Sequence, residues 1–266
     1  MRSSAISWKV LGSLGILLAA GCGPEQLEPE VDGVENLGPY AEQMPWEEYM
    51  ATASMDTVEG VAASSACTTG SILGLSKQIV AEMNCVRSGL MSDISGANVT
   101  LTSSAALPYL QNPAAQALRA ATAGRSALPL NSTLRTVAQQ WILYNWYQTG
   151  RCGVALAAKP GSSNHEDGLA FDTSAYSSWK SILQSHSFSW FGSSDVVHFD
   201  YTGAGGVDAP SVLAFQRLWN RNHPSDRIAE DGAYGPQTGA RIDRSPIAGF
   251  PIGPSCASAA TALTTL

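Results

Sequence analysis

Two histidines and a carboxylate in this chain have the residue types and neighbours expected of a metal site. The chain of 266 residues contains only four histidines. His165 lies in the segment SNHEDGLAFD at 163–172, and His198 ends the segment DVVH at 195–198. Two imidazoles and one carboxylate can hold a zinc ion while leaving one position open, as a catalytic zinc requires. We therefore expect one Zn²⁺, bound by His165, Asp172 and His198.

A further carboxylate, Asp195, stands three residues before His198 and is a candidate general base. Zinc lowers the pKa of a bound water from ~16 to about 7 and polarises a carbonyl, and a nearby carboxylate can then move the proton. The pattern therefore predicts a zinc hydrolase. The zincin motif HExxH is absent because residue 169 is Leu.

A serine enzyme is the competing interpretation of another short motif. Ser177-x-x-Lys180 fits the SxxK pattern of serine D,D-peptidases and β-lactamases. No SDN, KTG or GxSxG motif accompanies it in the chain. A two-residue pattern of this kind arises easily by chance, so the sequence favours the metal enzyme.

The first 22 residues predict export. Arg2 and Lys9 precede a short apolar run at 10–20, which is too short to span a bilayer comfortably. The run ends in LAAGC at 18–22, which resembles a bacterial lipobox with Cys22 as the lipidated residue. An ordinary secretory signal with a chance cysteine is the alternative. We expect an exported lipoprotein of the bacterial cell envelope, anchored to the membrane and facing the periplasm.

The net charge of −7 is concentrated in one segment. Residues 23–60 contain ten Asp and Glu and no Lys or Arg, so from residue 61 onward twelve acids face thirteen bases. We interpret residues 23–62 as an acidic, Pro-rich linker. The near-neutral remainder gives no indication of a nucleic-acid partner, and we expect a monomer.

Four cysteines follow Cys22, and an even number in an exported chain indicates two disulfides. They are Cys67, Cys85, Cys152 and Cys256. Three pairings are possible, and our preference is Cys85–Cys152 with Cys67–Cys256. The absence of CxxC spacing argues against a zinc site made of these cysteines.

Helices mixed with strands, without regular alternation, predict an α+β fold in which flanking helices pack on an antiparallel sheet. Helices are expected at about 72–83, 114–123, 134–147, 179–186 and 212–222, with another short helix after Asp231. The helix at 134–147 would be capped near Ser132 or Thr133. Strands are expected at 128–132, 154–158, 169–173 and 196–201, and a turn at Gly168 would bring His165 and Asp172 to one metal.

The full pattern Ser163-x-His165-x-x-Gly168-x-Ala170-x-Asp172 resembles the signature of the zinc D-Ala-D-Ala peptidases, a family that also includes phage endolysin peptidases and the hedgehog signalling domain. Further segments match in order over roughly residues 70–204. They are the Ser-x-x-Arg-like stretch at 132–140, the loop at 158–163, and Asp195-x-x-His198. The resemblance implies a hedgehog/D,D-peptidase-like fold for residues 63–204.

The resemblance also implies roles for individual residues. His165, Asp172 and His198 would hold zinc, and Asp195 would take a proton from the attacking water and deliver it to the leaving amine. Arg135 would steady a substrate carboxylate or oxyanion, for which a forked, permanently charged guanidinium is suited. Ser132, Gln139 and Ser163 would contact the substrate. We interpret Asp200 as a surface residue or a support for His198.

A second, weaker resemblance lies at 205–250. Phe215-Gln216 with Asp231-Gly232-x-x-Gly235-Pro236-x-Thr238 resembles a truncated peptidoglycan-binding helical module. A simple packing extension of the main domain is the alternative. Residues 251–266 form a small polar tail.

The resemblance implies the activity of a D-alanyl-D-alanine carboxypeptidase acting on peptidoglycan stem peptides. The carboxypeptidase branch usually carries Glu where this chain has Asp195, and some endopeptidase relatives carry Asp. A peptidoglycan endopeptidase of the same family is therefore the close alternative. A non-catalytic, zinc-containing cell-wall binding module is a third possibility, although it would not need Asp195.

Overall fold

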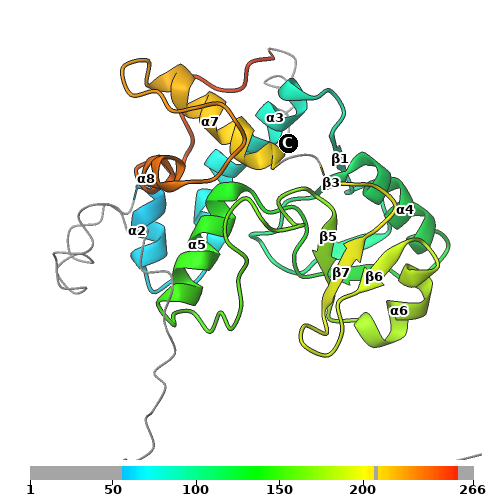
Figure 1. The fold of residues 1–266 in the computed structure, drawn as a ribbon. Coiled ribbons are helices and arrows are strands. Elements are labelled where there is room, and N and C mark those ends of the chain that lie inside the picture. The colour runs from blue at the N-terminus through cyan, green and yellow to red at the C-terminus, as the bar shows by residue number, and fades with distance from the viewer. Residues whose placement is uncertain (1–55, 207–208, 257–266) are drawn as a thin grey trace, which may run out of the picture. The chain divides into compact units, whose positions relative to one another are not determined.

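The computed structural model describes residues 56–206 and 209–256, and their helices and strands are shown in Figure 1. The buried apolar residues form two clusters, one among helices and one around a small sheet. The helical cluster is built from α2 (Val58–Ala63), the 3₁₀ helix η1 (Thr69–Ile72), α3 (Leu73–Val86), α5 (Val137–Gln148), α7 (Pro210–Asn222) and α8 (Pro236–Asp243).

The second cluster surrounds a three-stranded antiparallel sheet in the order β5 (Ala170–Asp172), β7 (His198–Tyr201), β6 (Phe188–Trp190). The helices α4 (Asn112–Thr122) and α6 (Tyr176–Gln184) contribute to the same cluster. Phe171 and Phe199 are fully buried cross-strand neighbours whose rings stack. The next pair in this register is Asp172 and His198. Burial of the phenylalanines thus fixes the two expected metal ligands opposite each other.

Two short strand pairs complete the structure. β1 (Met91–Asp93) pairs antiparallel with β3 (Tyr109–Gln111), and β2 (Val99–Leu101) pairs parallel with β4 (Leu128–Leu130). A mixed arrangement with helices flanking small sheets agrees with the α+β class. The parallel pair departs from the expected antiparallel pairing, because α4 and its flanking loops form a crossover that returns the chain in the same direction.

Most of the expected elements are present, but two predictions were wrong. The helix expected at 134–147 begins only at Val137, because Thr136 caps it and forms a reciprocal capping box with Gln139. Ser132 and Leu134 remain extended because they form β-bridges to Asp172 and Leu107. Residues 154–158 form no strand.

Two segments at the edges of the expected peptidase domain pack into the helical cluster. Residues 58–62 of the expected linker belong to α2, whose Val58 and Val61 are buried in the helical cluster. At the other end, α7 packs along α3 and shares that cluster, with Phe215 fully buried. The buried apolar residues of 209–250 therefore share the helical cluster with α3 and α5.

The disulfides are Cys67–Cys152 and Cys85–Cys256, so the preferred pairing was wrong. The reason is tertiary. The guanidinium of Arg151 donates hydrogen bonds to the carbonyls of Ala62, Ala63 and Ser64, which brings Cys152 to the chain segment that carries Cys67. The C-terminal segment runs back along α3, where the Ser255 backbone N–H donates to Glu82.

The predicted signal peptide, the lipidation of Cys22, most of the linker and the end of the tail lie outside the described residues. Within 56–206 and 209–256, none of the helices combines the length and the apolar character that a membrane crossing needs.

Candidate metal centre

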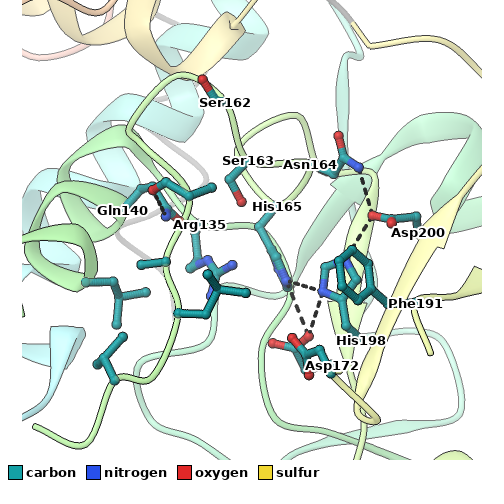
Figure 2. Close-up of a pocket in the computed structure, with 16 residues that line it drawn as sticks. Arg135, Gln140, Ser162, Ser163, Asn164, His165, Asp172, Phe191, His198 and Asp200 are labelled. Carbon is teal, nitrogen blue, oxygen red and sulfur yellow. Dashed lines mark hydrogen bonds and ion pairs between the residues drawn. The ribbon is translucent and has the colours of Figure 1, made fainter. Parts of the chain in front are cut away.

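His165, Asp172 and His198 present one ligand atom each to a common point, as Figure 2 shows. His165 Nε2 lies 3.3 Å from His198 Nδ1 and 3.4 Å from Asp172 Oδ1, and the latter two atoms are 3.1 Å apart. His165 precedes the turn, Asp172 ends β5 and His198 begins β7. The structure thus brings together the three residues expected to bind a metal.

The separations among these three atoms fit a tetrahedral ion of zinc's size. Zinc–nitrogen and zinc–oxygen bonds of about 2.0–2.2 Å at tetrahedral angles place neighbouring ligand atoms about 3.3–3.6 Å apart. The observed separations of 3.1, 3.3 and 3.4 Å are at or just below this range. The donor set of two imidazoles and one carboxylate also suits zinc. These residues could hold a metal ion with little rearrangement.

The remaining ring nitrogen of each histidine is held by an acceptor. His165 Nδ1 donates to the carbonyl oxygen of Thr133 at 2.7 Å, and His198 Nε2 donates to Asp200 Oδ1 at 2.9 Å. Asp200 Oδ1 also accepts from the side-chain amide of Asn164 at 2.8 Å. A histidine whose second nitrogen donates to an acceptor keeps its other lone pair aimed at a metal. Asp200 therefore orients His198.

The three residues differ in how their surroundings shift their pKa values. Burial, followed by the positive charge of Arg135, lowers the pKa of His165, so this imidazole is neutral and free to coordinate. Burial would raise the pKa of Asp172, but the two histidines and Arg135 together hold it well below its usual range. Burial would lower the pKa of His198, yet hydrogen bonds and charge from Asp172 and Asp200 raise it to about 9.

The turn that joins His165 to β5 depends on Gly168. This residue has φ of +66°, and a Cβ there would lie 2.7 Å from the backbone nitrogen of Gln111 and 2.8 Å from Met91 Sδ. Its N–H donates to the carbonyl of His165, and its carbonyl accepts from Gln111. The turn predicted at this glycine is confirmed, and only glycine satisfies both its backbone conformation and its space.

A buried carboxylate braces the loop before His165. Both oxygens of Glu166 lie 3.0 Å from the Gly161 backbone nitrogen, and one also accepts from the Ser163 N–H. Burial, opposed by these hydrogen bonds, raises the pKa of Glu166 to about 8. The expected loop at 158–163 is thus fixed from inside rather than by secondary structure.

The three ligands open onto a cavity of about 380 Å³, the size of a small-ligand site. Arg135 and Asp195 also line it, as does Ser163. Figure 2 shows Arg135 on one side of the ligand group and Phe191 on the other. Arg135 Nε is buried and has no hydrogen-bond partner among the described residues. A buried donor left unpaired is costly, so this cation is available to a ligand of the cavity.

Two residues expected to contact substrate lie elsewhere. Ser132 pairs through its backbone with Asp172 beside the sheet, and Gln139 is buried in the helix cap, where its amide also donates to the Ala105 carbonyl. Neither lines the cavity. The next residue, Gln140, does line it and donates to the Ala158 carbonyl at 2.7 Å.

Sequence reasoning did not find the apolar part of the cavity wall. It comprises Leu143, Val154, Leu156, Ala157, Ala158 and Phe191. No regular spacing in the sequence indicates that these residues line a cavity. The run of small and apolar residues at 154–158 is the one local signal, and it predicts a strand rather than a cavity wall.

Comparison with known proteins identifies no relative. No family model matches the chain, and no curated protein or solved structure is significantly similar to it. The function of this protein is therefore inferred from the residues and their geometry, together with the motif resemblance.

Proposed function

We propose that this protein is an exported zinc-dependent D-alanyl-D-alanine carboxypeptidase that acts on peptidoglycan stem peptides. The observation that carries the proposal is the convergence of His165, Asp172 and His198 on one point of a cavity that Arg135 and Asp195 also line. Metal ligands, a cation and a free carboxylate in one cavity are the parts that metal-assisted peptide hydrolysis needs.

Each residue has a distinct role in this proposal. Zinc, when bound, would supply an acidified water and polarise the scissile carbonyl. Arg135 pairs with the terminal carboxylate of the peptide, for which its buried and unpartnered Nε is suited. Asp195 accepts the proton of the attacking water and donates it to the leaving amine. His165 and His198 stay fixed because Thr133 and Asp200 hold their second nitrogens.

The choice of peptidoglycan depends on the motif resemblance and on the predicted export signal. Both indicate an enzyme that meets cell-wall peptides outside the cytoplasm. The two disulfides are consistent with an oxidising compartment.

An endopeptidase of the same kind is the second candidate. Two observations favour it: the shorter side chain of Asp195, and a cavity rim on which Leu156 and Phe191 remain largely exposed. An open rim of this kind leaves room for peptide on both sides of the cleaved bond.

Defined muropeptides incubated with the purified protein, with and without a chelator, test the proposal when the products are identified by mass. Release of single D-Ala supports the carboxypeptidase, and two peptide fragments support the endopeptidase. Bound zinc without any product supports a binding module. Absence of one equivalent of zinc would overturn the site itself.

The assignment of Asp195 has its own test. Asp195→Ala should abolish turnover and retain zinc, whereas Asp93→Ala, which removes an exposed carboxylate of β1 outside the cavity, should change neither. Turnover that persists in Asp195→Ala excludes this residue as the base.

A further inference from the structure

One wall of the cavity is a largely exposed segment, residues 154–158, whose three central residues have unpaired backbone groups. Val154, Leu156, Ala157 and Ala158 line the cavity, and the segment has no secondary structure. The backbone groups of residues 155–157 form no hydrogen bond with any other described residue. Unpaired backbone N–H and C=O groups can pair with the backbone of a second peptide.

The segment is nevertheless held at both ends. Before it, Cys152 is bonded to Cys67, and Arg151 donates to three backbone carbonyls at the end of α2. After it, the Ala158 carbonyl accepts from the buried Gln140, and the Gly161 N–H donates to Glu166. A segment fixed in this way loses little conformational entropy when it binds a partner.

The side chains of this wall are apolar. Leu156 is 66% exposed, and Leu143 and Val154 line the same cavity. Across the ligand group, Phe191 is 52% exposed and its ring meets His198 edge-on. Only four large hydrophobic side chains are exposed among the described residues, and two of them border this one cavity. Such a concentration indicates a binding surface rather than scattered exposure.

We propose that residues 154–158 form a subsite for an extended peptide, with its backbone paired to residues 155–157 and an uncharged, apolar side chain against Leu156. The inference deepens the proposed function, on which it rests. Residues 154–158 have no charged side chain, so they offer no ion-pair partner to a charged residue of the bound peptide. The substrate class is therefore a peptide longer than two residues with a small apolar residue beside the cleaved bond, and free dipeptides are poor substrates.

Leu156→Ser tests the apolar contact, and Ile252→Ser is its matched control because Ile252 is 53% exposed and lies outside the cavity. We expect Leu156→Ser to lower kcat/KM for an N-acetylated tetrapeptide ending in D-Ala-D-Ala about tenfold, mainly through KM. Free D-Ala-D-Ala should be cleaved poorly by the wild type. Leu156→Met should keep kcat/KM close to that of the wild type, and Ile252→Ser should leave it unchanged. Equal effects of the two serine variants would overturn the inference.

A binding measurement separates this inference from the proposed activity. Zinc-loaded Asp195→Ala is titrated with the same tetrapeptide while backbone amide signals are followed by NMR. Shifts at Ala155, Leu156 and Ala157 support the subsite, and their absence overturns it. If the wild type hydrolyses no peptide, the proposed function fails, but the titration still decides whether this segment binds peptide.

Discussion

The turn at Gly168 gives the sharpest test of how the site is positioned. In Gly168→Ala, an L-residue would occupy φ of +66°, and its Cβ would lie 2.7 Å from the Gln111 nitrogen. Gly124 provides a matched control, because its φ is +67° and a Cβ there would have no neighbour within 4 Å. The two variants share the backbone cost and differ in the steric one.

The expected losses of stability follow from the backbone cost and the steric cost. A left-handed backbone costs an L-residue about 1–2 kcal/mol, and the lower entropy of the unfolded alanine chain offsets about 0.4–1 kcal/mol of that. Gly124→Ala should therefore reduce the free energy of unfolding by about 1 kcal/mol. Gly168→Ala should lose a further 1–3 kcal/mol or so, because its neighbours are backbone and a packed methionine that must move.

Urea denaturation of both variants, monitored by tryptophan fluorescence, measures the difference in stability. Zinc affinity, measured by competition with a chelator, should fall only in Gly168→Ala, because this turn sets the distance between His165 and Asp172. Equal stability losses in the two variants, with zinc affinity unchanged in both, would refute the argument that the turn positions the site.

Three other perturbations have defined outcomes. Cys67→Ser with Cys152→Ser opens a loop whose ends are 85 residues apart, and should lower the free energy of unfolding by about 2–4 kcal/mol in denaturant titrations. Burial raises the pKa of Asp243 to about 8, above its value of ~4 in the unfolded chain. The contribution of Asp243 to the free energy of unfolding is therefore fully present below pH ~4 and is lost as the pH rises to about 8. Asp243→Asn should lessen that decline, by at most about 1.4 kcal/mol per pH unit, in urea titrations from pH 4 to 9. Trp190→Phe removes the hydrogen bond from the indole N–H to the carbonyl of Val196, the residue after Asp195. This variant should lower kcat about tenfold, with KM and zinc content unchanged. An unchanged kcat would count against a role of Trp190 in positioning Asp195.

Local pattern was sufficient to predict the central part of the candidate site. Strands were predicted at 169–173 and 196–201, and Gly168 predicted the turn before the first of them. Because side chains alternate along a strand, burial of the phenylalanines determined which way Asp172 and His198 point. These relations involve near neighbours and can be inferred from short segments.

The start of α5 was less predictable. Ser132, Thr133 and Thr136 are all good N-cap residues, so the sequence offered several starts. The capping box of Thr136 with Gln139 was a usable signal that favoured the last of them. Tertiary β-bridges hold Ser132 and Leu134 extended, which places Gln140 rather than Gln139 at the cavity.

The pairing of cysteines and the cavity wall depended on contacts between distant segments. Cys67 meets Cys152 across 85 residues, and the segment at 154–158 is shaped by Gln140 and by its two anchored ends. No local periodicity encodes such contacts, because they form only when separate elements pack.

The sequence by itself therefore determined which three residues could hold a metal ion and the turn that joins two of them. These follow from residue type and from spacings of a few residues. The tertiary structure alone decided how closely the three ligand atoms approach, that Asp200 and Thr133 hold the histidines, and which apolar residues line the cavity. Those properties arise from packing between two separate clusters, where position is set by burial and hydrogen bonding across the fold.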